Sequence, residues 1–326
     1  MPGNTIDSRP AELLADTAYA LVSAGATADD LFTEHLSEVP PHLSEALAPV
    51  VRLPDRTSGR RVIPDLLSAF GDPGPTPAHW KEAQSERTRA IDLAVILVGS
   101  VLGQVFGWTG QQDGRLLHNI VPSKGQEDMQ VGASSSTPLE WHTEDSFHPR
   151  RAELLLLACV RNHDLVGSRV ASIRRAGLSD GQIDVLGQPE VMIFPDASYP
   201  DDWRAHAGPR RGIRTIWLAE DGPCLRYDPF YSDFTGASPE FMAAYAALAE
   251  ALDSCAEDVV AHEGDILLLD NDVAVHGRAA YRPRFDGTDR WLKRILVRLD
   301  RPRPREEAAE EDFGQTVVEP WPSEAP

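Results

Sequence analysis

The chain is poor in cysteine: its 326 residues include only Cys159, Cys224 and Cys255, which are far apart and form no CxxC pair. An odd number of widely spaced thiols argues against a disulfide framework and against a zinc-thiolate site. Such cysteines suit a reducing compartment, and the N-terminus shows no basic segment followed by an apolar run. We therefore expect a cytoplasmic protein.

Long apolar runs and an excess of basic residues are also lacking. The longest apolar stretch, residues 94–101, is far shorter than the roughly 20 residues that a membrane span needs, so we expect no membrane partner. Lysine and arginine number 31 against 51 acidic residues, a formal net charge of −20. A field of that sign repels phosphate backbones and argues against a nucleic-acid partner. The run 305–312 holds five acids, and we expect residues 301–326 to form an acidic, disordered tail.

The rest of the chain falls into two parts with different residue patterns. The first part reads as helical, with apolar residues at helical spacing over 10–22, 28–38 and 78–104. After Gly107, short strand-like runs follow one another, interrupted by predicted helices at 179–186 and 239–252. The predicted strands are 116–122, 153–160, 170–173, 191–194, 213–219, 265–269 and 291–299. Many short strands with turn residues between them indicate a sandwich or a closed barrel.

One histidine pattern points to a metal site. Of the ten histidines, only His142 opens an H-x-E/D pair, in His142-Thr-Glu144. On a strand, residues i and i+2 point the same way, so such a pair supplies two ligands from one strand end. About one such pair is expected by chance, so its context matters. The pair precedes the apolar run 154–157, and far downstream a buried strand at 264–270 leads to His276 beside a glycine.

An arginine follows at a spacing that suits an acidic cosubstrate. Arg290 comes fourteen residues after His276 and opens the last strand, where a guanidinium can hold a carboxylate with two parallel hydrogen bonds. Two histidines and one carboxylate on one face of Fe(II) leave three positions for an oxoacid and O₂.

These residues carry a family resemblance. The matching segments are Leu117–Pro122, Trp141–Pro149, Pro195–Tyr199 and Gly287–Arg294, in order over about residues 85–300. In them the chain resembles the clavaminate synthase-like branch of the taurine dioxygenase superfamily, and in particular the arginine and asparagine hydroxylases of peptide-antibiotic biosynthesis. The resemblance implies a mainly β fold with flanking helices around a double-stranded β-helix, or jelly roll. It implies one domain over 1–300, with a mostly helical part (1–106) packed on the core (107–300).

The resemblance also implies the site. Fe(II) would be held by His142, Glu144 and His276, and 2-oxoglutarate by Arg290, with O₂ as the second cosubstrate and ascorbate as a support in vitro. Ser168 lies about where the family has a hydroxyl on the same carboxylate, although a solvent-facing serine is an equal alternative. The oligomeric state is left open.

The resemblance suggests residues for a small-molecule amino-acid substrate. Arg294 would hold the α-carboxylate, Gln111 (with Gln112 as its rival) the α-ammonium group, and Asp228 a guanidinium. The arginine enzymes have a second acid where this chain has Phe230, which opens the choice to citrulline, a cyclic guanidino amino acid or a shorter polar one. Asp196 is a further polar contact or, equally, a loop-capping residue. Arg294 could also be a surface arginine.

The predicted function is hydroxylation of a free L-amino acid (arginine, citrulline or a related polar or guanidino one) at an unactivated β or γ carbon, in natural-product biosynthesis. A desaturase or oxidative cyclase would use the same ligands and is not excluded. A halogenase lacks the carboxylate ligand, so Glu144 argues against it. A metal-dependent hydrolase would leave Arg290 and Arg294 without a role. A jelly-roll binding protein with a decayed site should have lost at least one of the four key positions, yet all four are present.

Overall fold

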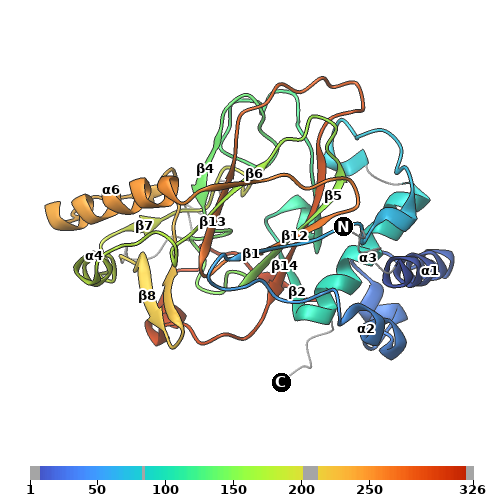
Figure 1. Ribbon diagram of the computed structural model, residues 1–326, viewed down its shortest axis with the longest axis horizontal. Coiled ribbons are helices and arrows are strands. Elements are labelled where there is room, and N and C mark those ends of the chain that lie inside the picture. The colour runs from blue at the N-terminus through green and yellow to red at the C-terminus, as the bar shows by residue number, and fades with distance from the viewer. Residues whose placement is uncertain (1–7, 83–84, 201–211, 321–326) are drawn as a thin grey trace, which may run out of the picture.

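The computed structural model describes residues 8–82, 85–200 and 212–320 (Figure 1). Its helices are α1 (Arg9–Ser23), α2 (Pro41–Leu47), α3 (Glu86–Leu102), α4 (Asp180–Leu186) and α6 (Pro239–Ser254), with short turns η1 (Leu31–His35), η2 (Ser68–Phe70), η3 (Trp80–Glu82), η4 (Gln112–Gly114) and η5 (Arg305–Ala309). Its strands are β1 (Arg60–Ile63), β2 (Gln104–Trp108), β3 (Leu117–Ile120), β4 (Leu139–His142), β5 (Leu154–Arg161), β6 (Ser168–Ser172), β7 (Met192–Ile193), β8 (Ile216–Ala219), β9 (Gly222–Leu225), β10 (Ser232–Asp233), β11 (Glu257–Val259), β12 (Ile266–Asp270), β13 (Ala274–Arg278), β14 (Trp291–Arg298) and β15 (Val317–Val318). The fold is mainly β, and the paired strands of both large sheets run antiparallel.

A seven-stranded sheet forms the centre, in the order β1-β12-β5-β14-β2-β15, with β3 also paired to β14. Strand β5 is apolar along almost its whole length because both of its faces are buried. Leu154 and Leu156 pack into the core beneath the N-terminal helices, whereas Leu155 and Leu157 pack into the core on the other face. The alternation of side chains along a strand produces this division.

A four-stranded sheet, β11-β6-β13-β4, lies across the second core from the central sheet. Helices α1, α2 and α3 cover the opposite face of the central sheet and gather on the right in Figure 1, while α4 and α6 lie at the far left. The molecule therefore has a helical layer, a large sheet and a smaller sheet, with one apolar core in each gap.

Helix α3 shows how sequence and packing agree. Ser85 caps its N-terminus, because its side chain accepts a hydrogen bond from the Thr88 amide. The run from Leu93 to Val98 is buried throughout, as its almost wholly apolar sequence predicts. The helix is shorter than the predicted 78–104, since the capping serine sets its start and Gly103 follows its end.

Several strands escaped the sequence prediction. Strand β1 lies in the part expected to be helical and pairs with β12. His276 was expected beyond a strand end, but it lies within β13. The predicted helix 28–38 is only the π-helical turn η1, and α2 was not foreseen. Short strands carry little periodicity of their own and depend on their partners in the sheet for stability.

The expectation of a disordered C-terminal tail is wrong for residues 301–320. Strand β15 pairs with β2, and Phe313 packs against Phe147. Two acids of this segment pair with buried arginines: Glu307 Oε2 lies 2.8 Å from Arg151 Nη1, and Glu310 Oε2 lies 2.5 Å from Arg226 Nη1. An acidic run was taken for a solvated end because its basic partners lie far away in the sequence. Residues 321–326 lie outside the described part.

Among the described residues, no helix combines the length and apolar character needed to cross a membrane.

Candidate metal centre and substrate cavity

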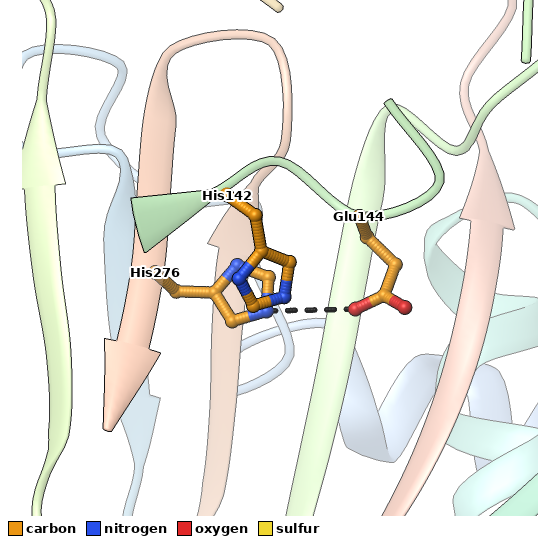
Figure 2. A group of neighbouring side chains, drawn as sticks. All are labelled: His142, Glu144 and His276. Atoms are coloured by element: carbon orange, nitrogen blue, oxygen red, sulfur yellow. Dashed lines mark ion pairs between the residues drawn. The ribbon is translucent and has the colours of Figure 1, made fainter. Parts of the chain in front are cut away.

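Three side chains converge where β4 and β13 pair. His142 ends β4 and lies directly opposite His276 of β13, with ring centroids 4.1 Å apart. Glu144 lies two residues beyond His142, and its Oε2 is 3.4 Å from His276 Nε2. One ligand atom from each of the three lies within 4.8 Å of the others. Figure 2 shows the three side chains pointing toward one another. The group offers two imidazoles and a carboxylate, the set that suits a non-haem Fe(II) centre.

The hydrogen bonds around the triad leave the ligand atoms available. His142 Nδ1 lies 2.9 Å from the Glu140 carbonyl oxygen. Because a carbonyl only accepts, Nδ1 carries the proton and the lone pair of Nε2 is free for a metal. Burial and the neighbouring His276 lower the pKa of His142, which favours the neutral ring that a metal requires.

Glu144 is anchored through its backbone. Asn271 accepts a hydrogen bond from the Glu144 amide at 2.7 Å and donates to the Glu144 carbonyl at 3.0 Å. Burial by itself raises the pKa of Glu144, but Arg294 and His276 together hold it well below its ordinary value. The carboxyl is therefore anionic at neutral pH, which is the form that binding a metal would require.

Arg294 joins the triad to the cavity wall. Its guanidinium donates to Glu144 Oε1, to Gln111 Oε1 at 2.9 Å and to His118 Nδ1 at 2.6 Å. The amide nitrogen of Gln111 donates to Ser198 Oγ at 3.2 Å, which sets the orientation of that side chain. The structure thus brings Arg294 and Gln111 together beside Glu144, whereas Gln112 bonds to the backbone of Asn119.

Arg290 lies at another part of the cavity wall. Its Nη2 donates to Ser168 Oγ at 3.0 Å, and Ser168 is buried rather than solvent-facing. Arg290 Nε is buried without a hydrogen-bond partner, and within the described residues no carboxylate forms an ion pair with this guanidinium. An arginine with a buried, unused donor fits a site for an anionic cosubstrate.

These side chains line one cavity of about 370 Å³. The triad, Arg290 and Arg294 all line it, together with Asp196, Asp228 and Phe230. Asp228 is buried, and burial raises the pKa of its carboxyl to about 6. Burial likewise raises the pKa of Asp196. Phe230 is 58% exposed, so it belongs to the rim of the cavity rather than to its interior.

Sequence reasoning did not single out two residues that support this wall. His118 was part of a matching segment but received no role, and Asn271 was read only as a residue after a strand. His118 lies on a strand that the sequence predicts, and a pairing of that strand with the last one would have pointed to it. In the structure His118 lies opposite Arg294 in the pairing of β3 with β14. The contact between Asn271 and Glu144 spans 127 positions and carries no local signal.

Comparison with known proteins decides the family. Residues 202–296 match the family described as taurine catabolism dioxygenase TauD, TfdA family. The chain is 35% identical over 246 residues to the L-ornithine/L-arginine 3-hydroxylase of Catenulispora acidiphila, covering 69% of this chain and 72% of that protein. It is also 35% identical over 256 residues to the enduracididine beta-hydroxylase of Streptomyces hygroscopicus, covering 72% and 74%. The chain belongs to the TauD/TfdA dioxygenase family.

A solved structure extends the likeness to the whole fold. The crystal structure of the non-haem iron oxygenase OrfP with Fe and alpha-ketoglutaric acid superposes with a TM-score of 0.78 at 34% identity, covering 90% of this chain and 93% of that one. This TauD/TfdA protein is a non-haem iron, 2-oxoglutarate-dependent dioxygenase, with Fe(II), 2-oxoglutarate and O₂ as its cofactor and cosubstrates. The His-Glu-His group and the unpaired guanidinium of Arg290 fit these groups.

Proposed function

We propose that this dioxygenase hydroxylates a free L-amino acid with a polar or guanidino side chain, such as arginine, citrulline or a cyclic guanidino amino acid, at its β or γ carbon. The observation that carries the proposal is the Arg294–Gln111 pair beside Glu144, with Asp228 and Asp196 on the same cavity wall. A free amino acid needs a cation for its carboxylate and an acceptor for its ammonium group, and this wall offers both. The names of the relatives, which include arginine, ornithine and enduracididine hydroxylases, support the same class.

In this proposal His142, Glu144 and His276 hold Fe(II), and Arg290 with Ser168 holds the far carboxylate of 2-oxoglutarate. Bound iron with its cosubstrates supplies the oxidant that inserts oxygen into a C–H bond while 2-oxoglutarate becomes succinate and CO₂. We further propose that the two sheets form the jelly roll that the sequence predicts, and that the enzyme acts in natural-product biosynthesis. The three free cysteines support a cytoplasmic location.

The protein's own residues would fix which carbon reacts. Arg294 orients the α-carboxylate by hydrogen bonds from a planar fork, and its position beside Glu144 brings the amino-acid head close to the metal. Each of Asp228 and Asp196 uses one oxygen to accept a backbone amide, from Tyr231 and Ser198 respectively. Their second oxygens can receive the polar end of the substrate. Holding both ends leaves the β and γ carbons between them as targets.

Phe230 at the rim makes the guanidinium site less acidic than in the similar arginine enzymes. Its ring packs edge-on against Tyr231, with centroids 4.9 Å apart. A guanidinium can bind over an aromatic face. When one carboxylate is missing, a neutral urea group loses less binding free energy than a cationic guanidinium does. We therefore propose both arginine and citrulline as substrates to be compared directly.

Succinate formation from 2-oxoglutarate with Fe(II) and ascorbate, against a panel of free L-amino acids, tests the proposal. The panel contains arginine, citrulline, ornithine, a cyclic guanidino amino acid, lysine and asparagine, and the product mass is recorded. A product about 16 mass units heavier supports a hydroxylase. A product lighter by about 2 identifies a desaturase or cyclase instead. Silence across the panel, with 2-oxoglutarate bound, contradicts a free polar amino acid as the substrate.

A further inference from the structure

Arg278 is a buried cation on the cavity wall with no role in the proposed site. It ends β13 two residues after His276, so both side chains point to the same face of the strand. Across the sheet, Arg278 pairs with Ser168, and His276 pairs with Val170. Arg278 is 3% exposed and lines the cavity together with Ser168 and Arg290.

The hydrogen bonds of Arg278 all go to uncharged oxygens. Its Nη1 donates to the Ser134 carbonyl at 2.6 Å, and its Nη2 donates to Ser134 Oγ at 3.0 Å and to the Thr137 carbonyl at 3.1 Å. Its Nε donates to the Ala279 carbonyl at 3.2 Å. These contacts tie the end of β13 to residues 134–137, which precede β4.

Arg278 differs in this respect from other buried arginines of the protein. Arg151 and Arg226, which are also almost fully buried, each pair with a carboxylate of the C-terminal segment. Within residues 8–82, 85–200 and 212–320, no carboxylate lies close enough to form an ion pair with Arg278. Burying a guanidinium without an anion is costly, and the Tyr281 ring, whose centroid lies 5.1 Å from Arg278 Cζ, offsets only part of that cost. Such a residue therefore suits an anionic ligand.

Ser168 is a neighbour of both Arg278 and Arg290. It accepts a hydrogen bond from Arg290 and lies opposite Arg278 in the sheet. Arg278 and Arg290 carry like charges and line the same cavity beside Ser168, so their guanidinium groups repel each other. An anion placed at Ser168 would relieve this repulsion, and one carboxylate could then interact favourably with both charges.

We propose that Arg278 is a second positioning cation for the far carboxylate of the dicarboxylate cosubstrate, and that its hydrogen bonds make residues 134–137 more ordered when this carboxylate binds. The inference rests on the proposed cosubstrate site at Arg290 and Ser168. Arg290 would make the direct contact. Arg278 would add charge and connect occupancy of the site to the segment that leads into β4.

The amides of this segment can report on the connection. Ser134 donates its amide to the Val131 carbonyl, and Ser135 donates its amide to the Glu127 carbonyl, both at 3.0 Å. These bonds must open before the amides exchange with solvent, so hydrogen exchange measures their stability. The readout does not depend on turnover.

The test uses the full chain with Fe(II) under anaerobic conditions. Calorimetry gives the Kd for 2-oxoglutarate, and hydrogen exchange follows residues 131–138 with and without it. In the unmodified protein we expect 2-oxoglutarate to slow exchange at Ser134 and Ser135 at least about 5-fold. Arg278→Gln removes the charge and should raise the Kd about 10-fold, with the protection lost. Arg278→Lys keeps the charge but not the planar fork, so its Kd should change less than about 3-fold while the protection is lost.

Two further variants make the outcome decisive. Arg282→Gln removes a nearby exposed charge and should behave as the unmodified protein does. Ser134→Ala removes one bond from the loop side, leaves every charge in place and should weaken only the protection. The inference is overturned if 2-oxoglutarate binds with equal Kd to Arg278→Gln, or if it leaves exchange at 134–137 unchanged in the unmodified protein. Failure of the unmodified protein to bind 2-oxoglutarate at all would instead overturn the proposed cosubstrate site.

Discussion

Arg290 and Arg294 show how single residues on one strand acquire different tasks. An offset of four keeps both on the face of β14 that carries Leu292 and Leu296 into the core between the sheets. Lys293, between them, points the other way and lies 2.5 Å from Asp92 on α3. The two arginines thus reach the cavity from one face of the strand, while their neighbour ties the same strand to the helical layer.

Arg290→Ala should raise the 2-oxoglutarate concentration needed for half-maximal turnover by about 10-fold to 100-fold. The reason is that a hydrogen bond to a charged group contributes about 1.5–3 kcal/mol, and the carboxylate would lose its charge partner. Steady-state kinetics with varied 2-oxoglutarate measure the change, and Arg282→Ala is the control for a surface arginine. An unchanged requirement would remove Arg290 from the cosubstrate site.

His118→Leu should raise the KM for the amino acid about 10-fold and leave the KM for 2-oxoglutarate unchanged. His118 Nε2 lies 3.1 Å from the Arg115 carbonyl, which only accepts, so Nδ1 is the acceptor for Arg294. Burial and the charge of Arg294 lower the pKa of His118 to about 3, so the ring stays neutral at physiological pH. Leucine removes the acceptor and frees the guanidinium to tilt. His118→Asn, which retains an acceptor, should recover part of the loss, and equal increases in both KM values would contradict this role.

At the scale of secondary structure, the C-terminal segment is part of the architecture of the site. Strand β15 extends the sheet beside Trp108, whose Nε1 donates to Asp145 at 2.8 Å. Asp145 also accepts a hydrogen bond from Tyr199 at 2.7 Å, Phe147 packs against that tyrosine, and Phe313 packs against Phe147. The Gln111 amide donates to Asp145 at 3.4 Å, so the C-terminal segment supports the residues that contact Gln111.

Glu307→Gln should destabilise the protein by about 3 kcal/mol at pH 7, because Arg151 would keep a buried charge without its anion. Burial by itself raises the pKa of Glu307, but Arg151 and Arg226 hold it below its ordinary value of 4.5. The contribution of the carboxylate is therefore complete above about pH 4.5 and is lost as the pH falls through the lower pKa of the folded state.

Urea unfolding of both proteins at pH 7 and at about pH 3.5 measures this change, with the difference between them shrinking at the lower pH. Glu306→Gln is the matched control, since the neighbouring Glu306 forms an exposed pair with Arg214 that should contribute less than about 1 kcal/mol. Equal effects of the two substitutions would show that the pair with Arg151 adds little to stability.

At the scale of the whole molecule, the net charge of −20 contrasts with the positive end of the cavity. Arg278 is buried and Arg290 is half-buried, and among the described residues neither forms an ion pair with a carboxylate near Ser168. A small dianion is therefore attracted where the cations are concentrated, while a long polyanion meets the field of the whole protein.

Fe(II) with 2-oxoglutarate should raise the thermal unfolding midpoint, because ligands that bind only the folded state stabilise it by mass action. At 100 times the Kd the gain is about 2.7 kcal/mol. A chelator should reverse it. His276→Ala should retain the midpoint of the metal-free protein but show no gain, since one of the three ligands is missing. Anaerobic thermal melts check this, and an equal gain in the variant would contradict the metal site.

The sequence by itself determined the features that follow from local periodicity and spacing. The H-x-E pair at a strand end, the even offset between Arg290 and Arg294 and the apolar run of α3 are all set by a period of two or 3.6 residues. The class of enzyme followed from several matching segments in the correct order. Such features can be predicted from a few residues that are close together in the sequence.

Only the tertiary structure decided the features that join distant segments. These features are the anchoring of Glu144 by Asn271, the hydrogen bonds from Arg278 to residues 134–137, and the pairing of the acidic tail with Arg151 and Arg226. Each of them spans at least 84 positions. A charged run predicts solvent until its partners are known, because burial of a charge depends on what the fold brings next to it. Strands β1 and β13 were not predicted for a similar reason. Short strands are stabilised by pairing across the sheet, and this pairing leaves little pattern in their own sequence.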